Sequence, residues 1–100
     1  MKETGRNGYQ SQLKNTLYEM FPGCTILRLD PNSNPQGTPD LLVLFNDRWA
    51  ILEVKASAKA KHQPNQPYYV EKFGQMSFAS FIYPENESEV LDALQSAFTD

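Results

Sequence analysis

The feature that most constrains the fold is a pair of apolar segments separated by a three-residue polar connection. Leu41–Phe45 contains only apolar residues, as expected for a strand that is covered on both faces of a sheet. Asn46-Asp47-Arg48 predicts a tight turn, and residues 49–55 predict the next strand, so the two strands form a hairpin. A strand covered on both faces needs further layers around it. The chain is therefore predicted to have a layered α/β fold.

The segment before this hairpin predicts a helix and a short strand. Pro22-Gly23 ends the helix, and residues 25–29 form the strand. Residues 30–38 are rich in proline, asparagine and glycine and predict a loop. The helix is predicted from apolar residues at helical spacing, namely Tyr9, Leu13, Leu17, Met20 and Phe21.

The segment after the hairpin predicts two more helices with a strand between them. Asn65 or Gln66 is expected to cap the first of these helices, and residues 77–83 form the strand. Asn86 and Glu89 predict a capping box at the start of the last helix. The apolar stripe of that helix is Val90, Leu91, Leu94 and Phe98. The predicted order is α-β-β-β-α-β-α, with a mixed central sheet flanked by helices.

Length and composition bound the class of protein. The chain has 100 residues, of which 40% are apolar and 21% charged, which predicts one folded domain over residues 1–100. The longest apolar run has five residues and is too short to span a membrane, and no signal peptide is visible. Cys24 is the only cysteine and cannot form an internal disulfide. We therefore expect a reducing, cytoplasmic setting.

The net charge of −3 alone argues against nucleic acid as a partner, because phosphate binding usually needs a basic surface. Five of the twelve acids, however, lie in the last sixteen residues. Residues 1–84 hold nine bases and seven acids, and Lys55, Lys59, Lys61 and His62 form a basic cluster. Such a cluster is either a solvated surface or, because it begins at the candidate active site, a surface for DNA phosphates.

Three charged residues lie at the ends of the predicted hairpin strands. Asp40 follows Thr38-Pro39, and Glu53 and Lys55 lie two residues apart, so their side chains share one face of the strand. Asp40, Glu53 and the backbone carbonyl of Val54 are suitable ligands for Mg²⁺ or Mn²⁺. Lys55 is expected to orient the attacking water, to stabilise the transition state or to act as a general base. The alternative is an ordinary ion-pair network, but charges at the ends of apolar strands are costly unless they are paired or used.

These residues resemble a known pattern. Gly37-Thr38-Pro39-Asp40, Glu53-Val54-Lys55 and Gln66-Pro67-Tyr68-Tyr69 together resemble the PD-(D/E)xK nuclease superfamily. Within it the chain is most similar to small stand-alone VRR-NUC and Holliday-junction-resolvase-like nucleases of phages and bacteria. The resemblance implies a restriction-endonuclease-like αβββαβ core.

The resemblance also implies roles for individual residues. Asp40 and Glu53 would hold the metal, Lys55 would be the catalytic lysine, and Gln66 would reach toward the active site or the scissile phosphate. Tyr69, one turn on, either contacts nucleic acid or packs in the core. One departure concerns the first helix, where such nucleases often have a glutamate. Glu3 and Glu19 do not fall at that place, and Gln10 or Gln12 is expected to take over as a polar group near the metal site.

Two functions follow from this pattern. The first is a metal-dependent DNA endonuclease, acting as a homodimer on branched or duplex DNA, with Lys59, Lys61, His62 and Tyr69 contacting the nucleic acid. The second is a nuclease-fold DNA-binding or assembly module without catalysis, which the net acidity and the missing helix glutamate favour.

Overall fold

The computed structural model describes residues 5–99 and has the predicted order of elements. The elements are α1 (Gly5–Met20), β1 (Thr25–Arg28), β2 (Leu41–Phe45), β3 (Arg48–Val54), α2 (Gln66–Met76), β4 (Phe78–Ile82) and α3 (Glu87–Thr99). Most predicted bounds differ from these by one or two residues, but α1 begins four residues before Tyr9. None of the helices within residues 5–99 has the length and apolar character needed to cross a membrane.

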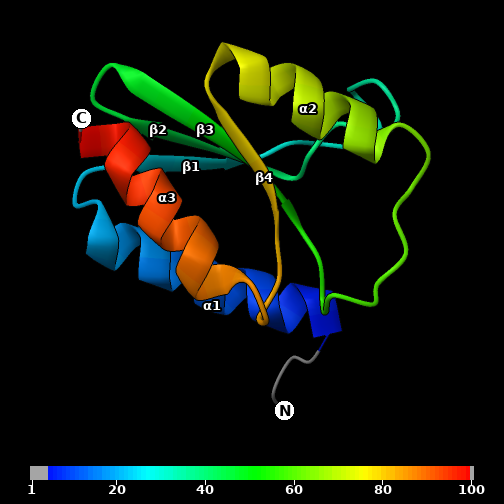
Figure 1. Cartoon of the computed structure of the whole chain (residues 1–100), viewed down its shortest axis with the longest axis horizontal. Coiled ribbons are helices and arrows are strands. Elements are labelled where there is room, and N and C mark those ends of the chain that lie inside the picture. The colour runs from blue at the N-terminus through cyan, green and yellow to red at the C-terminus, as the bar shows by residue number, and fades with distance from the viewer. Residues whose placement is uncertain (1–4, 100) are drawn as a thin grey trace.

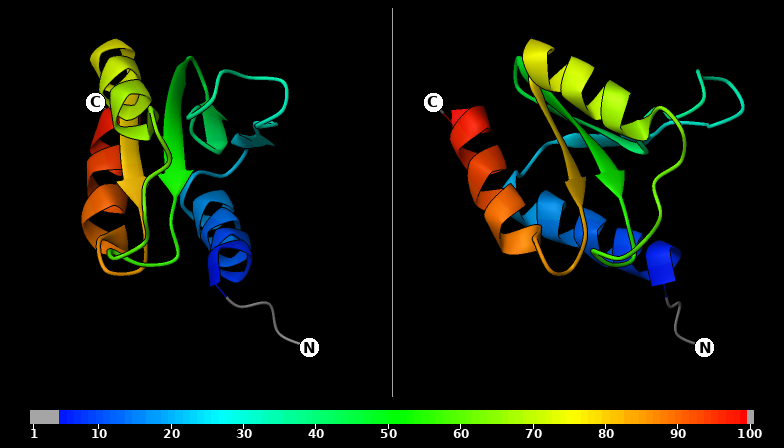
Figure 2. Two further views of the ribbon diagram at one scale, coloured as in Figure 1. Left: turned by 90° about the vertical axis from the view of Figure 1, so that its right-hand side faces the viewer. Right: turned by 45° about the vertical axis from the view of Figure 1, so that its right-hand side comes forward.

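The four strands form one mixed sheet in the order β1-β2-β3-β4. The predicted hairpin is present, because β2 and β3 pair antiparallel with Val43 opposite Ala50. β1 pairs antiparallel with β2, and β4 pairs parallel with β3. The parallel pair is joined through α2, as a parallel connection requires a crossover. Helices α1 and α3 lie on one side of this sheet and α2 on the other (Figures 1 and 2).

The main core lies between the sheet and the helices α1 and α3. Alternate residues of β3 point into it, because side chains along a strand alternate between its two faces. Its fully buried members include Leu13, Leu17, Leu41, Val43, Ala50, Leu52, Val54, Ile82 and Leu94. Each fully buried leucine or valine contributes about 1.5–3 kcal/mol to folding. The stripes predicted for α1 and α3 therefore supply the core, and they fix both helices against one face of the sheet.

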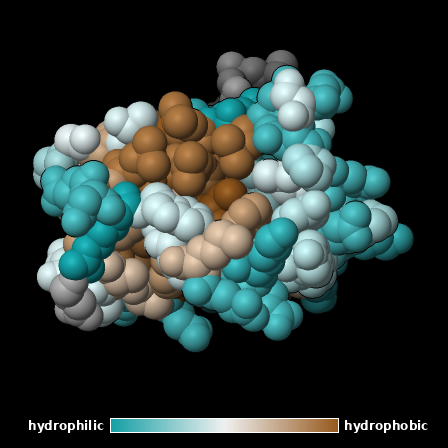
Figure 3. All heavy atoms as spheres, turned by 90° about the horizontal axis from the view of Figure 1, so that it is seen from above, coloured by the Kyte–Doolittle hydropathy of each residue, from teal (hydrophilic) through white to brown (hydrophobic). Residues whose placement is uncertain are grey.

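The opposite face of the sheet is only partly covered. α2 contacts β3 and β4, and the rings of Trp49 and Phe73 lie 6.4 Å apart between centroids. Leu27 on β1 and Leu44 on β2 are exposed at 45% and 36%. Figure 3, which views the molecule from the side of α2, shows apolar side chains gathered on this surface.

Asn65 and Asn86 stand at the predicted helix N-termini, but neither side chain makes the predicted capping bond within the described residues. Asn65 stands at the N-cap of α2, but its backbone is left-handed with φ of 74° and its side chain makes no capping hydrogen bond. The Asn86 side chain points back toward β4, because its Oδ1 accepts from Tyr83 N at 2.8 Å and its Nδ2 donates to Phe81 O at 3.1 Å. No bond of the predicted capping box with Glu89 forms within the described residues. Asn86 therefore fixes the turn between β4 and α3.

The 30–38 loop packs closely against the segment that precedes α2. Gly37 has φ of +93°, and a Cβ atom there would lie 2.8 Å from the backbone of Pro64 and Asn65. Only glycine fits both this backbone conformation and this close approach. The contact joins the 30–38 loop to the start of α2.

The Gly37→Ala substitution is expected to destabilise the protein by about 2 kcal/mol, because it adds both backbone strain and overpacking. Urea unfolding followed by circular dichroism measures the change. Gly74→Ala is the matched control, since a Cβ there would lie 3.9 Å from its nearest neighbour in the middle of α2. We expect Gly74→Ala to raise stability by up to about 1 kcal/mol. Equal stability changes in the two variants would contradict the proposed loop contact.

Candidate active site

Asp40 lies between the 30–38 loop and β2, where three hydrogen bonds hold it. Its carbonyl accepts from Leu29 N at 2.7 Å, which extends the pairing of β1 with β2. Its Oδ2 accepts from Val54 N at 2.9 Å. Its Oδ1 pairs with Arg6 Nη1 at 3.0 Å. The predicted approach of Asp40 to the end of β3 is confirmed, and Arg6 joins it from α1.

Glu53 is the most unusual residue of the site. It is completely buried, and neither of its carboxylate oxygens has a hydrogen-bond partner within the described residues. Burial and, next, the neighbouring negative charge of Asp40 raise the pKa of Glu53, Lys55 and Arg6 lower it, and the net result is a pKa of about 8. A buried carboxylate without hydrogen bonds is costly unless a positive charge compensates it. The site therefore favours a cation at this position.

Lys55 shares the face of Glu53, as the strand alternation predicts. Its Nζ lies 3.6 Å from Glu53 Oε2, too far for a hydrogen bond but close enough for an ion pair. The same Nζ donates to Gln66 Oε1 at 2.7 Å and to the carbonyl of Lys61 at 3.0 Å. Lys55 is only 7% exposed, and these bonds hold its ammonium in one place beside the carboxylates.

Gln66 opens α2 and is buried there. Its Oε1 accepts from Gln63 N at 2.7 Å as well as from Lys55 Nζ. The side chain thus orients the lysine and does not serve as a simple helix cap. The sequence predicted that Gln66 reaches toward the site, and the structure places it in direct contact with Lys55.

The first helix contributes an arginine and a glutamine, not an acid. Gln10 lies one turn after Arg6, so the two side chains share a face of α1. Gln10 is buried, its Nε2 has no hydrogen-bond partner among the described residues, and Gln12 is exposed. Glu19 is exposed near the end of α1, and Glu3 lies outside the described residues. Of the two predicted substitutes for the helix acid, Gln10 is therefore the one that is buried.

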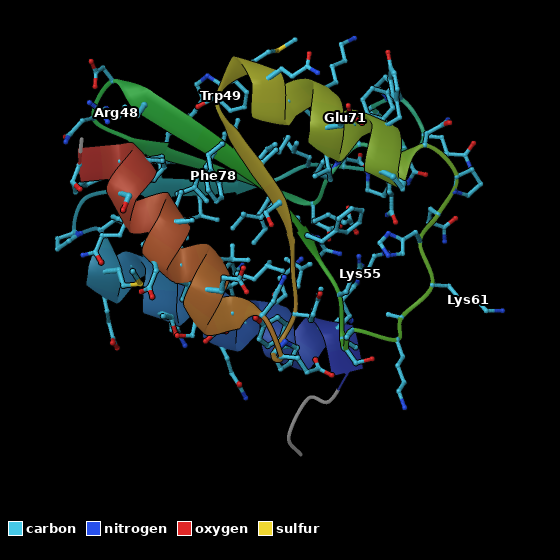
Figure 4. The ribbon with its side chains drawn as sticks, viewed as in Figure 1. Arg48, Trp49, Lys55, Lys61, Glu71 and Phe78 are labelled. Carbon is cyan, nitrogen blue, oxygen red and sulfur yellow. The ribbon has the colours of Figure 1, made fainter. Side chains whose placement is uncertain are left out.

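The residues predicted to bind nucleic acid lie on the loop after β3 and on α2. Lys59, Lys61 and His62 are exposed, and Figure 4 shows the Lys61 side chain pointing away from the protein. The His62 ring lies 4.3 Å from the Phe81 ring. Tyr69 is half-buried and stacks on Phe73 at 5.8 Å between centroids. Lys55 is buried and donates to the Lys61 carbonyl, whereas the side chains of Lys59, Lys61 and His62 are exposed, so the basic cluster of the sequence divides into a buried and an exposed part.

The residues present suit a hard divalent cation. Mg²⁺ takes one or two carboxylates and completes its coordination with water and phosphate oxygens. Asp40 and Glu53 would hold it, and the unpartnered oxygens of Glu53 are the observation that supports this fit. Within residues 5–99 no third Asp, Glu, His or Cys joins them in a metal-binding group. The structure does not test the role predicted for the Val54 carbonyl.

Comparison with known proteins supports the fold. No protein-family model matches the chain, and no curated protein matches it. A solved structure described as a VRR_NUC domain is similar, with a TM-score of 0.66 and 22% sequence identity. The match covers 93% of this chain and 97% of that one. The chain therefore has the restriction-endonuclease-like fold predicted from its sequence.

Proposed function

We propose that this chain, which has the fold of a VRR_NUC domain, is a metal-dependent DNA endonuclease that hydrolyses phosphodiester bonds. The observation that supports this most directly is the buried, unpartnered carboxylate of Glu53 between Asp40 and the fixed ammonium of Lys55. An ion-pair network that served only stability would satisfy these oxygens with hydrogen bonds, because a buried polar group without a hydrogen bond costs about 1–3 kcal/mol, and more when it is charged.

Each residue has a part in the proposed reaction. Asp40 and Glu53 hold Mg²⁺ or Mn²⁺, which when bound lowers the pKa of water and offsets charge on the phosphate. Lys55 places a positive charge where the transition-state oxygens gain negative charge, or orients the attacking water. Gln66 fixes the Lys55 ammonium through a hydrogen bond of 2.7 Å, so the lysine needs little reorganisation during the reaction.

The proposed partner is DNA, branched or duplex, and the exposed Lys59, Lys61 and His62 would lie along its phosphates. We also propose a homodimer with two active sites, since Leu27 and Leu44 leave apolar surface on the uncovered face of β1 and β2. Sedimentation equilibrium of wild type and of the Leu27→Glu variant tests the dimer. A wild-type monomer at all concentrations would exclude it.

A second function is a nuclease-fold DNA-binding or assembly module without catalysis. The observation in its favour is that Arg6 already pairs with Asp40, while Glu19, the acid of α1 within the described residues, is exposed near the helix end and joins no metal-binding group. DNA binding without metal-dependent turnover on duplex, flap and four-way-junction substrates would favour this module over the endonuclease.

The Asp40→Asn substitution tests the proposed endonuclease. We expect it to lower the rate of DNA cleavage in Mg²⁺ by at least about 100-fold, because it removes one of two charged metal ligands and keeps the shape of the side chain. Single-turnover cleavage of labelled duplex, flap and junction DNA measures the rate. Asp92→Asn, an exposed aspartate on α3, is the matched control and should cut like wild type. Equal cutting by the wild type and Asp40→Asn proteins would overturn the assignment.

A further inference from the structure

A cavity of about 400 Å³ opens beside the candidate active site. Asp40 and Gln66 form the side that it shares with this site. Its other walls come from Arg6 at the start of α1, from Arg28 at the end of β1, and from the 31–38 loop. The tight contact of Gly37 with Asn65 closes the loop against α2 and so shapes the cavity.

Three polar side chains of this cavity form no hydrogen bond or ion pair within the described residues, whereas its other polar side chains are bonded. Arg28 forms no ion pair within the part of the chain that the structure describes. The side-chain amides of Gln36 and Gln63 likewise make no hydrogen bond there. A guanidinium and two primary amides are the groups that proteins use to contact phosphates and the edges of bases.

The remaining walls are apolar. Leu29, Pro31 and Pro35 line the cavity between these polar groups. Pockets that hold an extruded base combine such apolar walls, which contact the flat faces of the ring, with polar groups that contact its edge. Arg6 and Arg28 outweigh the single charge of Asp40, so the lining favours an anionic ligand.

From this lining we propose that the cavity binds one unpaired nucleotide of the DNA, next to the phosphate that is cut. The proposal rests on the proposed endonuclease function and adds the class of substrate. Arg28 contacts the backbone phosphate, and Gln36 and Gln63 contact the base. The substrate is then DNA with an unpaired nucleotide at the cleavage position, as at a bulge, a flap or a branch.

The size of the cavity supports a single nucleotide. Small-ligand sites in proteins measure about 300–1,000 Å³, and this cavity lies near the lower limit of that range. A base inside a continuous duplex cannot enter it, because that base is stacked on both faces and paired at its edge. A continuous duplex must therefore unpair a base before it occupies the cavity, which costs a few kcal/mol.

Binding of DNA in EDTA tests the cavity without any need for cleavage. The same 2-aminopurine-labelled strand is used in two DNAs. In one it forms a continuous duplex, and in the other its complementary strand leaves the 2-aminopurine unpaired. We expect wild type to bind the unpaired form at least about ten-fold more tightly and to change the 2-aminopurine fluorescence. The Gln36→Ala/Gln63→Ala variant should lose this preference, because it removes the two side chains that contact the base. Both side chains are exposed, so their removal leaves the fold intact. Gln95→Ala, an exposed glutamine on α3, is the control that keeps it.

Cleavage of the same two DNAs in Mg²⁺ separates the two proposals. Equal affinity of wild type for both DNAs, no binding of either, or an unchanged preference in the double variant would overturn the cavity proposal. A protein that binds the unpaired form with preference but cuts no DNA supports the cavity and overturns the endonuclease. A protein that cuts both DNAs equally, without preference in binding, supports the endonuclease and overturns the cavity.

Discussion

The Glu53→Gln protein is expected to be more stable than wild type at pH 8 in EDTA and to have lost DNA cleavage. Stability rises because a neutral amide replaces a carboxylate that is buried without a hydrogen bond. We expect a gain of about 2 kcal/mol at pH 8. Cleavage falls by at least about 1,000-fold, because the amide removes the charge that would hold the metal. A residue kept only for stability would not show these opposite effects.

The stability gain should depend on pH in a defined direction. The pKa of Glu53 is about 8 in the folded protein and 4.5 ordinarily, so the folded state holds this proton more tightly than the unfolded state. The proton therefore stabilises wild type fully below pH 4.5, and this contribution is lost as the pH rises toward 8. The difference in stability between Glu53→Gln and wild type should grow over this range and reach the expected gain of about 2 kcal/mol at pH 8.

Urea unfolding in EDTA between pH 4.5 and pH 8.5 measures this difference. Glu71→Gln, an exposed glutamate on α2, is the matched control and should match wild type within about 0.5 kcal/mol at every pH. A wild-type protein that became more stable relative to Glu53→Gln as the pH rose would contradict the assigned burial of this carboxylate.

The Lys55→Met protein is expected to lose both stability and cleavage. Methionine keeps the length of the side chain but removes the ion pair with Glu53 and the hydrogen bonds to Gln66 and to the Lys61 carbonyl. Lys55→Met removes the ammonium beside a buried carboxylate that has no hydrogen bond, whereas Glu53→Gln leaves Lys55 with its two hydrogen bonds. We therefore expect Lys55→Met to cost about 2–3 kcal/mol at pH 8. Cleavage should fall by about 100-fold or more, as for other general acid–base or electrostatic groups.

A double-mutant cycle with Glu53→Gln isolates the ion pair. Lys55→Met should cost less stability in the Glu53→Gln background than in the wild-type background. The difference between the two losses, which is the coupling free energy, should be about 1 kcal/mol or more. Lys72→Met, an exposed lysine on α2, is the control for stability and should change it by less than about 0.5 kcal/mol. Additive effects in the cycle would show that Lys55 and Glu53 act independently.

The hairpin and its charged residues could be predicted because their signals are local. The apolar run Leu41–Phe45 has the period and length of a buried strand, and the turn after it fixes the antiparallel register. The alternation of side chains along β3 then places Glu53 and Lys55 on one face. Asp40 follows from the same hairpin, because it immediately precedes β2 and bonds to Val54 at the end of β3.

The parts that could not be predicted depend on contacts between distant segments. Arg6 lies 34 residues before Asp40, in a polar segment with no pattern that points to a site. The burial of Gln10 is set by the packing of α1, and the side-chain bonds of Gln66 depend on where α2 begins. Arg28 gives no signal in the sequence, because a lone arginine at the end of a strand is common. Gly37 belongs to the segment that precedes Asp40, but its contact with Asn65 depends on how two loops distant in the sequence pack in the folded protein.

The buried carboxylate of Glu53 has a consequence for any kinetic study of this protein. Near neutral pH most of this group holds a proton, which must leave when a divalent cation takes its place. We therefore expect proton release on metal binding and an apparent metal affinity that falls as the solution becomes more acid. Calorimetric titration with Mg²⁺ in buffers of different ionisation enthalpy measures the protons released, and a value of zero at pH 7 would contradict this expectation. The acid limb of a pH–rate profile at fixed Mg²⁺ would then report occupancy of the metal site and not the pKa of a general base.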